Sequence, residues 1–234
     1  MDASIVPYPA APDEPPSLSG WDTLLRTVLP ATLRPGWKLD HLFACDLRAY
    51  EPSGSRDDVH VEWLRSVSDL HPNHERFMVG HTGRAVWLGW KHRLRRRYCE
   101  LALGRMEDQI VHSTFVTQAG PGMRPYGPIM RPRTALVGPC FTAPAWRGKR
   151  IYPYVLSRVL LHLKRMGCAW ALIHCHVDNV ASERGIQQCA GWLYVGRFLL
   201  RRPPFGRHRI VGATLTHAEP TVFGSGGEQP QGTG

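Results

Sequence analysis

The sequence lacks any apolar run of the roughly 18 residues that a helix needs to cross a bilayer, so we expect no membrane span. Its start is proline-rich and acidic, where a secretory signal would be basic and then apolar. It also lacks a Cys-x-x-Cys pair, so we expect no metal site. We interpret the scattered cysteines as reduced core residues of a cytoplasmic protein. They are Cys45, Cys99, Cys140, Cys168, Cys175 and Cys189.

The chain has fewer acidic than basic side chains. The chain has 19 Asp and Glu against 29 Lys and Arg, a formal net charge of +10. Such an excess predicts an anionic partner. The basic residues concentrate at Arg93–Arg97, Arg147–Arg150 and Arg197–Arg209. Because the middle group lies in a glycine-containing turn, a phosphorylated small molecule is the first partner we expect, and nucleic acid is the second.

One globular domain with two tails is the simplest organisation for 234 residues. Residues 1–18 hold five prolines and few large apolar side chains, which predicts a disordered N-terminal segment. Residues 217–234 are rich in Gly, Gln and Pro, which predicts a disordered C-terminal tail. The domain should therefore occupy residues 19–216.

The first half of the domain gives local signals of several kinds. A short helix is predicted from Ser19 to Leu29, a strand over Lys38–Leu47, and a helix starting at Asp57 or Asp58. The Thr82-Gly83 pair between two short runs predicts a β-hairpin over residues 76–89. A further strand is expected over Gln109–Thr117, and the four prolines and three glycines of residues 118–132 predict a long loop.

In the second half of the domain, predicted strands and helices alternate more regularly. We predict strands over Thr134–Thr142 and Trp170–Val177, with a helix from about Arg150 to Met166 between them. Gly138-Pro139 should interrupt the first strand, because proline cannot donate to a sheet ladder. A short helix from Asp178 or Asn179 to about Ala190 and strands over residues 192–200 and 208–215 complete the prediction. The expected fold is mixed α/β (α+β).

The turn from Ala143 to Tyr152 is the most specific chemical signal. An apolar strand delivers Arg147-Gly148-Lys149-Arg150 into a helix start. Unpaired backbone N–H groups at a helix start, together with the helix dipole, favour phosphate. A plain structural turn is the alternative.

These residues resemble the GNAT acyltransferase superfamily. Pro144, Arg147, Gly148, Lys149 and Ile151 match its Pro-x-x-Arg-Gly-Lys-Gly-Ile loop, and the second motif is matched by Asn179, Ser182, Gly191 and Trp192. The variant with Arg150 and with Tyr152-Pro153 resembles an atypical branch. The resemblance implies a mostly antiparallel central sheet, flanked by helices, with splayed central strands. It also implies that acyl-CoA is the co-substrate.

The resemblance assigns cofactor roles to particular residues. Phe141 and Thr142 would contact pantetheine and the acyl carbonyl, while Asn179 and Ser182 would flank the pantetheine. The pyrophosphate would be bound by Arg147, Gly148, Lys149, Arg150, Ile151 and Tyr152. Many members of the family have a tyrosine as general acid on the short helix, where this chain has Ile186 or Gln187.

The acid and base therefore have to come from elsewhere. His174 and His176 alternate onto one face of a predicted central strand, and we take His176 as the leading base, because histidine titrates near neutral pH. Both could instead be packed sheet histidines. Tyr194 is the candidate acid, although an aromatic residue on a strand is often core. Weaker candidates are His112, Glu100 and Glu107.

The function predicted from these features is transfer of an acyl group, with acetyl the first choice, from acyl-CoA to a primary amine. The amine would belong to a small molecule such as an aminosugar or amino acid. An acyl-carrier protein is a second conceivable donor, and a homodimer is conceivable. One alternative is a CoA- or nucleotide-binding module without turnover. Another is an RNA-associated protein, suggested only by the basic and aromatic run from Trp87 to Tyr98.

Overall fold

The computed structural model describes residues 37–52, 54–119, 123, 126, 129, 132–201 and 209–215. The predicted disordered segments and the helix predicted from Ser19 lie outside these residues, and so does most of the predicted loop at 118–132. The domain boundaries at residues 19 and 216 therefore stay predictions.

The described strands form one eight-stranded sheet in the order β2-β3-β4-β5-β6-β1-β7-β8. Every neighbouring pair is antiparallel except β5 and β6, which are parallel. The mixed, mostly antiparallel sheet predicted from the sequence is thus confirmed. The strands are β1 Trp37–Asp46, β2 His60–Leu64, β3 Glu100–Met106, β4 Gln109–Gln118, β5 Thr134–Thr142, β6 Trp170–His176, β7 Leu193–Arg201 and β8 Arg209–Leu215.

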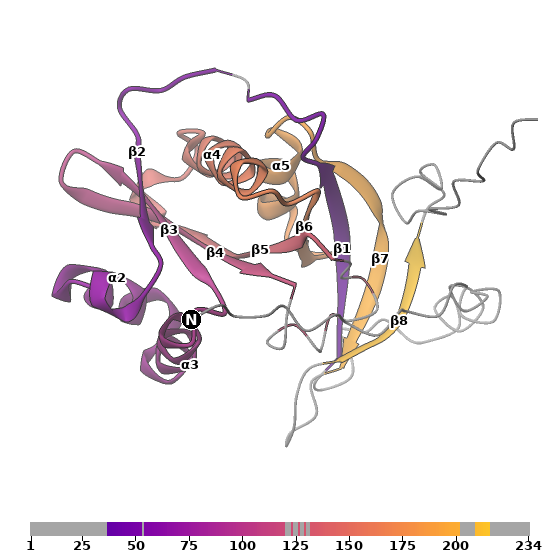
Figure 1. Ribbon diagram of the computed structural model, residues 1–234, viewed down its shortest axis with the longest axis horizontal. Helices are drawn as coiled ribbons and strands as arrows, with labels where there is room; N and C mark the ends of the chain where they lie inside the picture. The colour runs from indigo at the N-terminus through magenta and orange to yellow at the C-terminus, as the bar shows by residue number, and fades with distance from the viewer. Residues whose placement is uncertain are drawn as a thin grey trace, which may run out of the picture.

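Helices cover both faces of this sheet (Figure 1). On one face lie α4 (Ile151–Arg165) and α5 (Val180–Gln187), and on the other lie α2 (Pro72–Thr82) and α3 (Arg84–Arg95). The apolar residues of α4 repeat at helical spacing, and Val155, Val159 and Leu163 are fully buried against the sheet. No helix among the described residues is long and apolar enough to span a membrane.

Two predictions in the first half of the domain are wrong. The helix expected after Asp58 is the strand β2, whose partly buried Val61 and Trp63 pack on the core cluster beneath α4. The hairpin expected over residues 76–89 is the pair of helices α2 and α3. Gly83, with φ +79°, is the residue that separates the two helices and does not form a strand turn. The predicted strands at Lys38–Leu47 and Gln109–Thr117 are confirmed.

The parallel pair β5 and β6 separates part of the way along. Its Cα partners run from Thr134↔Trp170 to Val137↔Ile173 and stop there. The next β5 residues are Gly138, with φ +120°, and Pro139, where the sequence predicted an interruption. Beyond this point β5 stays paired with β4, but its edge toward β6 has no ladder partner. The predicted splay of the central strands is confirmed.

Strand β1 is inserted between β6 and β7, far from its sequence neighbour β2. It pairs over seven residues with β6, from Asp40↔His176 to Asp46↔Trp170, and also along β7. Six consecutive residues, Asp40 to Cys45, are buried. Phe43 and Cys45 face the helices α4 and α5, whereas Leu42 and Ala44 face the opposite side with Phe198.

Candidate functional site

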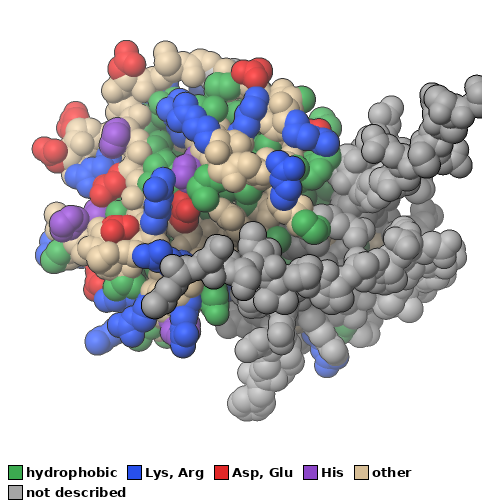
Figure 2. Space-filling model, in the orientation of Figure 1, with side chains coloured by type: hydrophobic (Ala, Val, Ile, Leu, Met, Phe, Trp, Pro, Cys, Tyr) green, Lys and Arg blue, Asp and Glu red, His purple; other side chains and the backbone are tan. Residues whose placement is uncertain are grey.

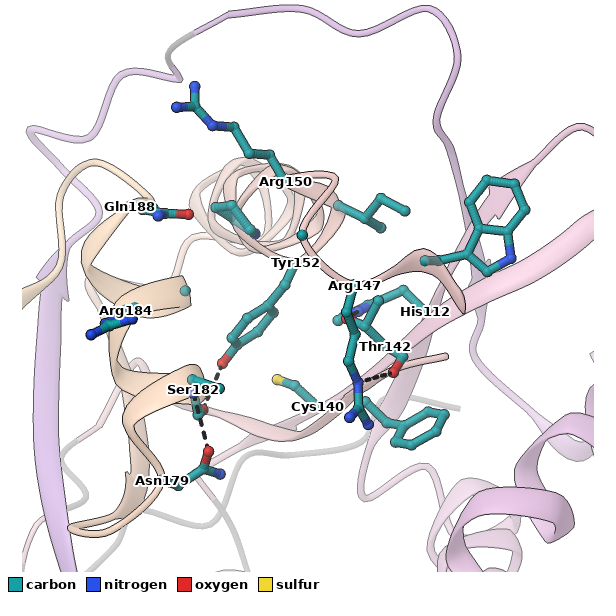
Figure 3. Close-up of a pocket in the computed structure, with 17 residues that line it drawn as sticks. His112, Cys140, Thr142, Arg147, Arg150, Tyr152, Asn179, Ser182, Arg184 and Gln188 are labelled. Atoms are coloured by element: carbon teal, nitrogen blue, oxygen red, sulfur yellow. Dashed lines mark hydrogen bonds between the residues drawn. The ribbon is translucent and has the colours of Figure 1, made fainter. Parts of the chain in front are cut away.

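A cavity of about 620 Å³ lies where β5 and β6 separate. Its walls come from the end of β5, the turn before α4, the first turn of α4, and α5 (Figure 3). All of the cofactor-binding residues predicted from the sequence line it, except Lys149. Lys149 instead places its ammonium group 4.3 Å from the ring centroid of Trp146. The fold therefore brings the loop motif around Arg147 together with the second motif at Asn179 and Ser182, as the sequence predicted.

The turn before α4 presents a run of free backbone N–H groups. Within the described chain, the amides of residues 148–152 donate no hydrogen bond to a backbone or side-chain acceptor. Gly148 has φ +76° and Arg150 has φ 56°, so the chain curls before the helix begins at Ile151. Successive amides in such a turn, at the positive end of a helix dipole, form a concave anion site.

Three arginines line the cavity around these amides. The Nε of Arg147 donates to the backbone carbonyl of Thr142 at 3.1 Å, and its guanidinium lies 5.9 Å from the ring centroid of Phe141. Arg150 is exposed and lines the cavity from the helix start, and Arg184 lines it from α5. Figure 2 shows Lys and Arg side chains gathered over the region of α4 and α5. The cavity therefore combines amide donors with positive charge.

Tyr152 points inward between α4 and α5 and does not project from the turn (Figure 3). Its hydroxyl lies 3.4 Å from the hydroxyl of Ser182, and its ring packs against Gly185 of α5. Asn179 begins α5 and accepts the backbone N–H of Ser182 at 3.1 Å. The bulky Tyr152 thus leaves the loop amides accessible, and the predicted motif residues on both helices contact one another.

His112 forms the floor of the cavity. Its two ring nitrogens lie 2.8 Å from Thr142 Oγ1 and 2.7 Å from Thr114 Oγ1. Burial lowers the pKa of His112 to about 3, so the ring is neutral at physiological pH. Burial also raises the pKa of the neighbouring Cys140 thiol to about 11. Neither group is therefore a ready base or nucleophile, and the hydrogen bonds of His112 join Thr142 to Thr114.

The predicted catalytic residues do not line the cavity. Tyr194 on β7 lies beyond β1, with its ring centroid 5.5 Å from that of His41 and 5.6 Å from that of Phe43. His176 ends β6, and its Nδ1 accepts the backbone N–H of Asp178 at 3.2 Å. On α5, Ile186 is fully buried and offers no proton donor. The assignments of His176 and Tyr194 stay predictions.

One contact could not be foreseen from the sequence. Asp40 Oδ2 lies 2.7 Å from Nδ1 of His174, on the sheet face opposite the cavity. In the sequence His174 stands out only as a companion of His176, and no local pattern marks Asp40. The pairing depends on β1 lying beside β6, a long-range arrangement that local sequence signals do not encode.

The basic and aromatic run from Trp87 to Tyr98 is part of α3 and the turn after it. Trp87 is buried, Trp90 stacks on Phe115, and Lys91 forms an ion pair with Glu75. Of its aromatic side chains only Tyr98 is strongly exposed. Stacking of nucleotide bases needs exposed rings, so the run gives little support for an RNA surface.

Comparison with solved structures identifies the fold. A GNAT-family acetyltransferase from Colwellia psychrerythraea superposes with a TM-score of 0.53 and 15% identity, over 78% of this chain and 60% of that one. A GCN5-related N-acetyltransferase from Kribbella flavida gives a TM-score of 0.45 and 11% identity, over 73% of this chain and 61% of that one. This chain thus spans less than two thirds of either structure. No protein-family model matches the sequence, and no curated protein matches it. The fold of this chain is that of the GNAT acetyltransferases.

Proposed function

We propose that the protein is an acyltransferase that moves an acyl group from acyl-CoA to a primary amine. The observation that carries this proposal is the cavity at the splay, which is lined by the end of β5 and by Gly148, Arg150, Ile151 and Tyr152 of a turn whose amides donate no described hydrogen bond. The amides suit a pyrophosphate, and the free strand edge suits the amide-containing pantetheine arm. The splay gives the thioester a way between the two strands.

The reaction needs few groups from the protein. The amine nitrogen attacks the thioester carbon, the C–N bond forms, and the C–S bond breaks to release CoA thiol. The substrate ammonium must first lose a proton to a base, and the departing sulfur must end as a thiol. The backbone N–H groups near Phe141 and Thr142 are our candidates to stabilise the oxyanion. For the base and acid, the sequence-based candidates are His176 and Tyr194.

The finer substrate assignment extends the same proposal. Acetyl is the acyl group we expect, and an aminosugar or amino acid is the class of acceptor. The basic rim of the cavity fits the negative charges of CoA, with an acyl-carrier protein as the other conceivable donor. We place the reaction in the cytoplasm, where acyl-CoA is available and the cysteines stay reduced.

A thermal-shift titration with CoA, acetyl-CoA, 3′-dephospho-CoA and palmitoyl-CoA tests this function. Saturable stabilisation by CoA and acetyl-CoA is expected, because a ligand that binds only the folded state raises the melting temperature. Release of CoA thiol in the presence of a panel of amines would then show turnover. Stabilisation without thiol release would favour the binding module, and no stabilisation by any thioester would contradict the acyl-CoA assignment.

Arg147→Ala should weaken CoA binding by about tenfold to a hundredfold, the range expected for loss of a charge-assisted hydrogen bond. Arg158→Ala is the matched control, because Arg158 lies on α4 but lines a groove beside β2, away from the cavity. Isothermal titration of both variants with CoA measures the difference. Equal affinities for CoA in the two variants would remove Arg147 from the phosphate site.

A further inference from the structure

The sheet face opposite the cavity carries a carboxylate–imidazole pair at the splay. His174 is the first β6 residue beyond Ile173, the last residue that pairs with β5. Its ring contacts residues of the opposite face, with Phe198 at 5.2 Å and Tyr126 at 5.6 Å between centroids, whereas Ile173 and Cys175 pack toward α4. A thioester that passes between β5 and β6 from the cavity would emerge beside His174.

Asp40 fixes the orientation of His174. The Asp40 side chain is 6% exposed, and its Oδ2 lies 2.7 Å from His174 Nδ1. Its other oxygen, Oδ1, is buried and has no hydrogen-bond partner among the described residues. A buried carboxylate with a single partner holds the proton on Nδ1, which leaves the Nε2 lone pair free to accept another. The His174 side chain is 21% exposed, so part of its ring reaches the protein surface.

The ring nitrogens of the other histidines near the splayed strands have different hydrogen-bond partners from those of His174. His176 accepts the Asp178 N–H at Nδ1, which favours the proton on Nε2, and the only described carboxylate near its ring, Asp178 at 3.5 Å, is exposed. His81 has Nδ1 2.8 Å from the Phe77 carbonyl and Nε2 3.3 Å from Ser113 Oγ, and both nitrogens of His112 are bonded to threonine hydroxyls. On β1, His41 has both ring nitrogens buried without a hydrogen-bond partner among the described residues, and its Nδ1 lies 3.4 Å from Glu183 Oε1. Among these five, only His174 combines an Nδ1 hydrogen bond to a carboxylate with a partly exposed ring whose Nε2 has no described partner.

We propose that His174 is the base that accepts the proton of the attacking ammonium, with Asp40 as its positioning residue, at an acceptor site on the face opposite the cavity. The inference rests on the proposed function, since it assigns the amine half of that reaction. When Nε2 accepts the proton, the imidazolium that forms is stabilised by the Asp40 carboxylate. The ligand of this face is accordingly a protonated primary amine.

The side chains around the Asp40–His174 pair come from β6, β1, β7 and the segment before β5. β6 contributes His176, the register partner of Asp40, and β1 contributes Lys38 two residues before Asp40 on the same face. β7 contributes the apolar Phe198, and the segment before β5 contributes Tyr126. No second carboxylate of the described residues lies within ion-pair distance of His174, so Asp40 is the group whose removal should matter.

The tautomers of the two histidines give the first test. In ¹⁵N spectra of the imidazole nitrogens at pH 8, His174 should be protonated at Nδ1 and His176 at Nε2. In Asp40→Asn the amide can donate to Nδ1, so the proton of His174 should move to Nε2. A His174 ring protonated at Nε2 in the unmodified chain, or one unchanged by Asp40→Asn, would overturn the pairing whatever the protein does with CoA.

The position of the base relative to the thioester gives the second test. Bromoacetyl-CoA places an electrophilic carbon near the acyl position, and the lone pair of Nε2 can attack it, forming a C–N bond and releasing bromide. Peptide mass spectrometry should find the adduct on His174. Labelling should be lost in His174→Gln, slowed at least tenfold in Asp40→Asn, and retained in the matched control His60→Gln, at an exposed position of β2. The thiol of Cys140 should react slowly, because burial keeps it protonated.

The two proposals fail in different ways. If bromoacetyl-CoA stabilises the protein but labels His176 or nothing, CoA binding stands and the assignment of His174 is overturned. If the reagent neither stabilises nor labels the protein, the proposed function fails and the assignment of His174 fails with it. Thermal melts of each variant show whether a loss of labelling reflects unfolding, and Asp40→Asn keeps the shape of the buried side chain for that reason.

Discussion

Gly185 is the residue on which the packing of the two cavity helices depends most directly. A Cβ at this position would lie 2.3 Å from Cδ1 and 2.7 Å from Cε1 of the Tyr152 ring. Gly185→Ala must therefore displace Tyr152 into the cavity or push α5 away from α4. We expect a loss of about 1–3 kcal/mol in the free energy of unfolding, the usual cost of overpacking, together with weaker CoA binding.

The matched control for Gly185→Ala is Gly89→Ala in α3. A Cβ at Gly89 meets no heavy atom within 4 Å, so the helix should gain up to about 1 kcal/mol from the better propensity of alanine. Urea unfolding of both variants gives the comparison. Equal effects of the two substitutions on stability would show that Tyr152 does not need the space that Gly185 leaves.

Arg150 stands at a position that glycine would occupy with less strain. It precedes α4 in the left-handed region, with φ 56° and ψ 24°. Arg150→Gly should raise the free energy of unfolding by up to about 1 kcal/mol, because the left-handed conformation is unfavourable for a residue with a Cβ. It should weaken CoA binding about tenfold by removing a positive charge from the cavity. Denaturant unfolding and calorimetry separate the two effects, and tighter CoA binding would mean that the arginine obstructs the phosphates.

At the scale of the elements, the second half of the fold could be predicted from the sequence. The β5–turn–α4–β6–α5 order follows from local signals: a buried helical repeat, Asn179 as a capping residue and Gly167 (φ +78°) just beyond the end of α4. The α2–α3 pair could not be predicted in this way. Thr82-Gly83 suits a hairpin turn and a helix junction equally well, and tertiary packing of Met78 and Trp87 decides between them.

Local sequence signals are limited in the same way at the candidate functional site. Local motifs predicted the residues that line the cavity, because they lie at strand ends and helix starts. The Asp40–His174 pair depends on the insertion of β1 between β6 and β7, which no local motif records. Sequence reasoning therefore predicts the residues of the cavity better than the Asp40–His174 pair on the opposite face.

The central place of β1 should be visible in amide hydrogen exchange. β1 has a strand on each side, whereas β2 is an edge strand. Amides of Leu42–Cys45 should exchange as slowly as those of β6, with opening free energies close to the global value. Amides of His60–Leu64 that do not bond to β3 should exchange much faster. Fast exchange throughout β1 would mean that it opens independently of the rest of the sheet.

For the whole molecule, buried histidines should make stability depend on pH. Burial lowers the pKa of His112 to about 3 and lowers the pKa of His81 and of His74. Because the unfolded chain binds these protons more tightly, the stabilisation is complete above about pH 6.5 and is lost as the pH falls. His112 alone should remove about 2 kcal/mol from the free energy of unfolding between pH 6.5 and pH 5.

Urea unfolding at pH 7 and pH 5 measures this loss. In His112→Gln the loss of stability between the two pH values should shrink by about that amount, while His60→Gln, at an exposed position of β2, should keep it unchanged. An identical pH dependence in His112→Gln and the unsubstituted chain would exclude His112 as a source of acid sensitivity.

The position of β1 also has a consequence for biosynthesis. Cys45 pairs with Ala171, and Leu39 pairs with Leu199, so β1 is synthesised well before either of its neighbouring strands. Until then the nascent chain carries an apolar strand with two unpaired edges, the kind of segment that aggregates or recruits chaperones. Slow elongation through the second half should therefore lower the yield of native protein more than slow elongation through the first.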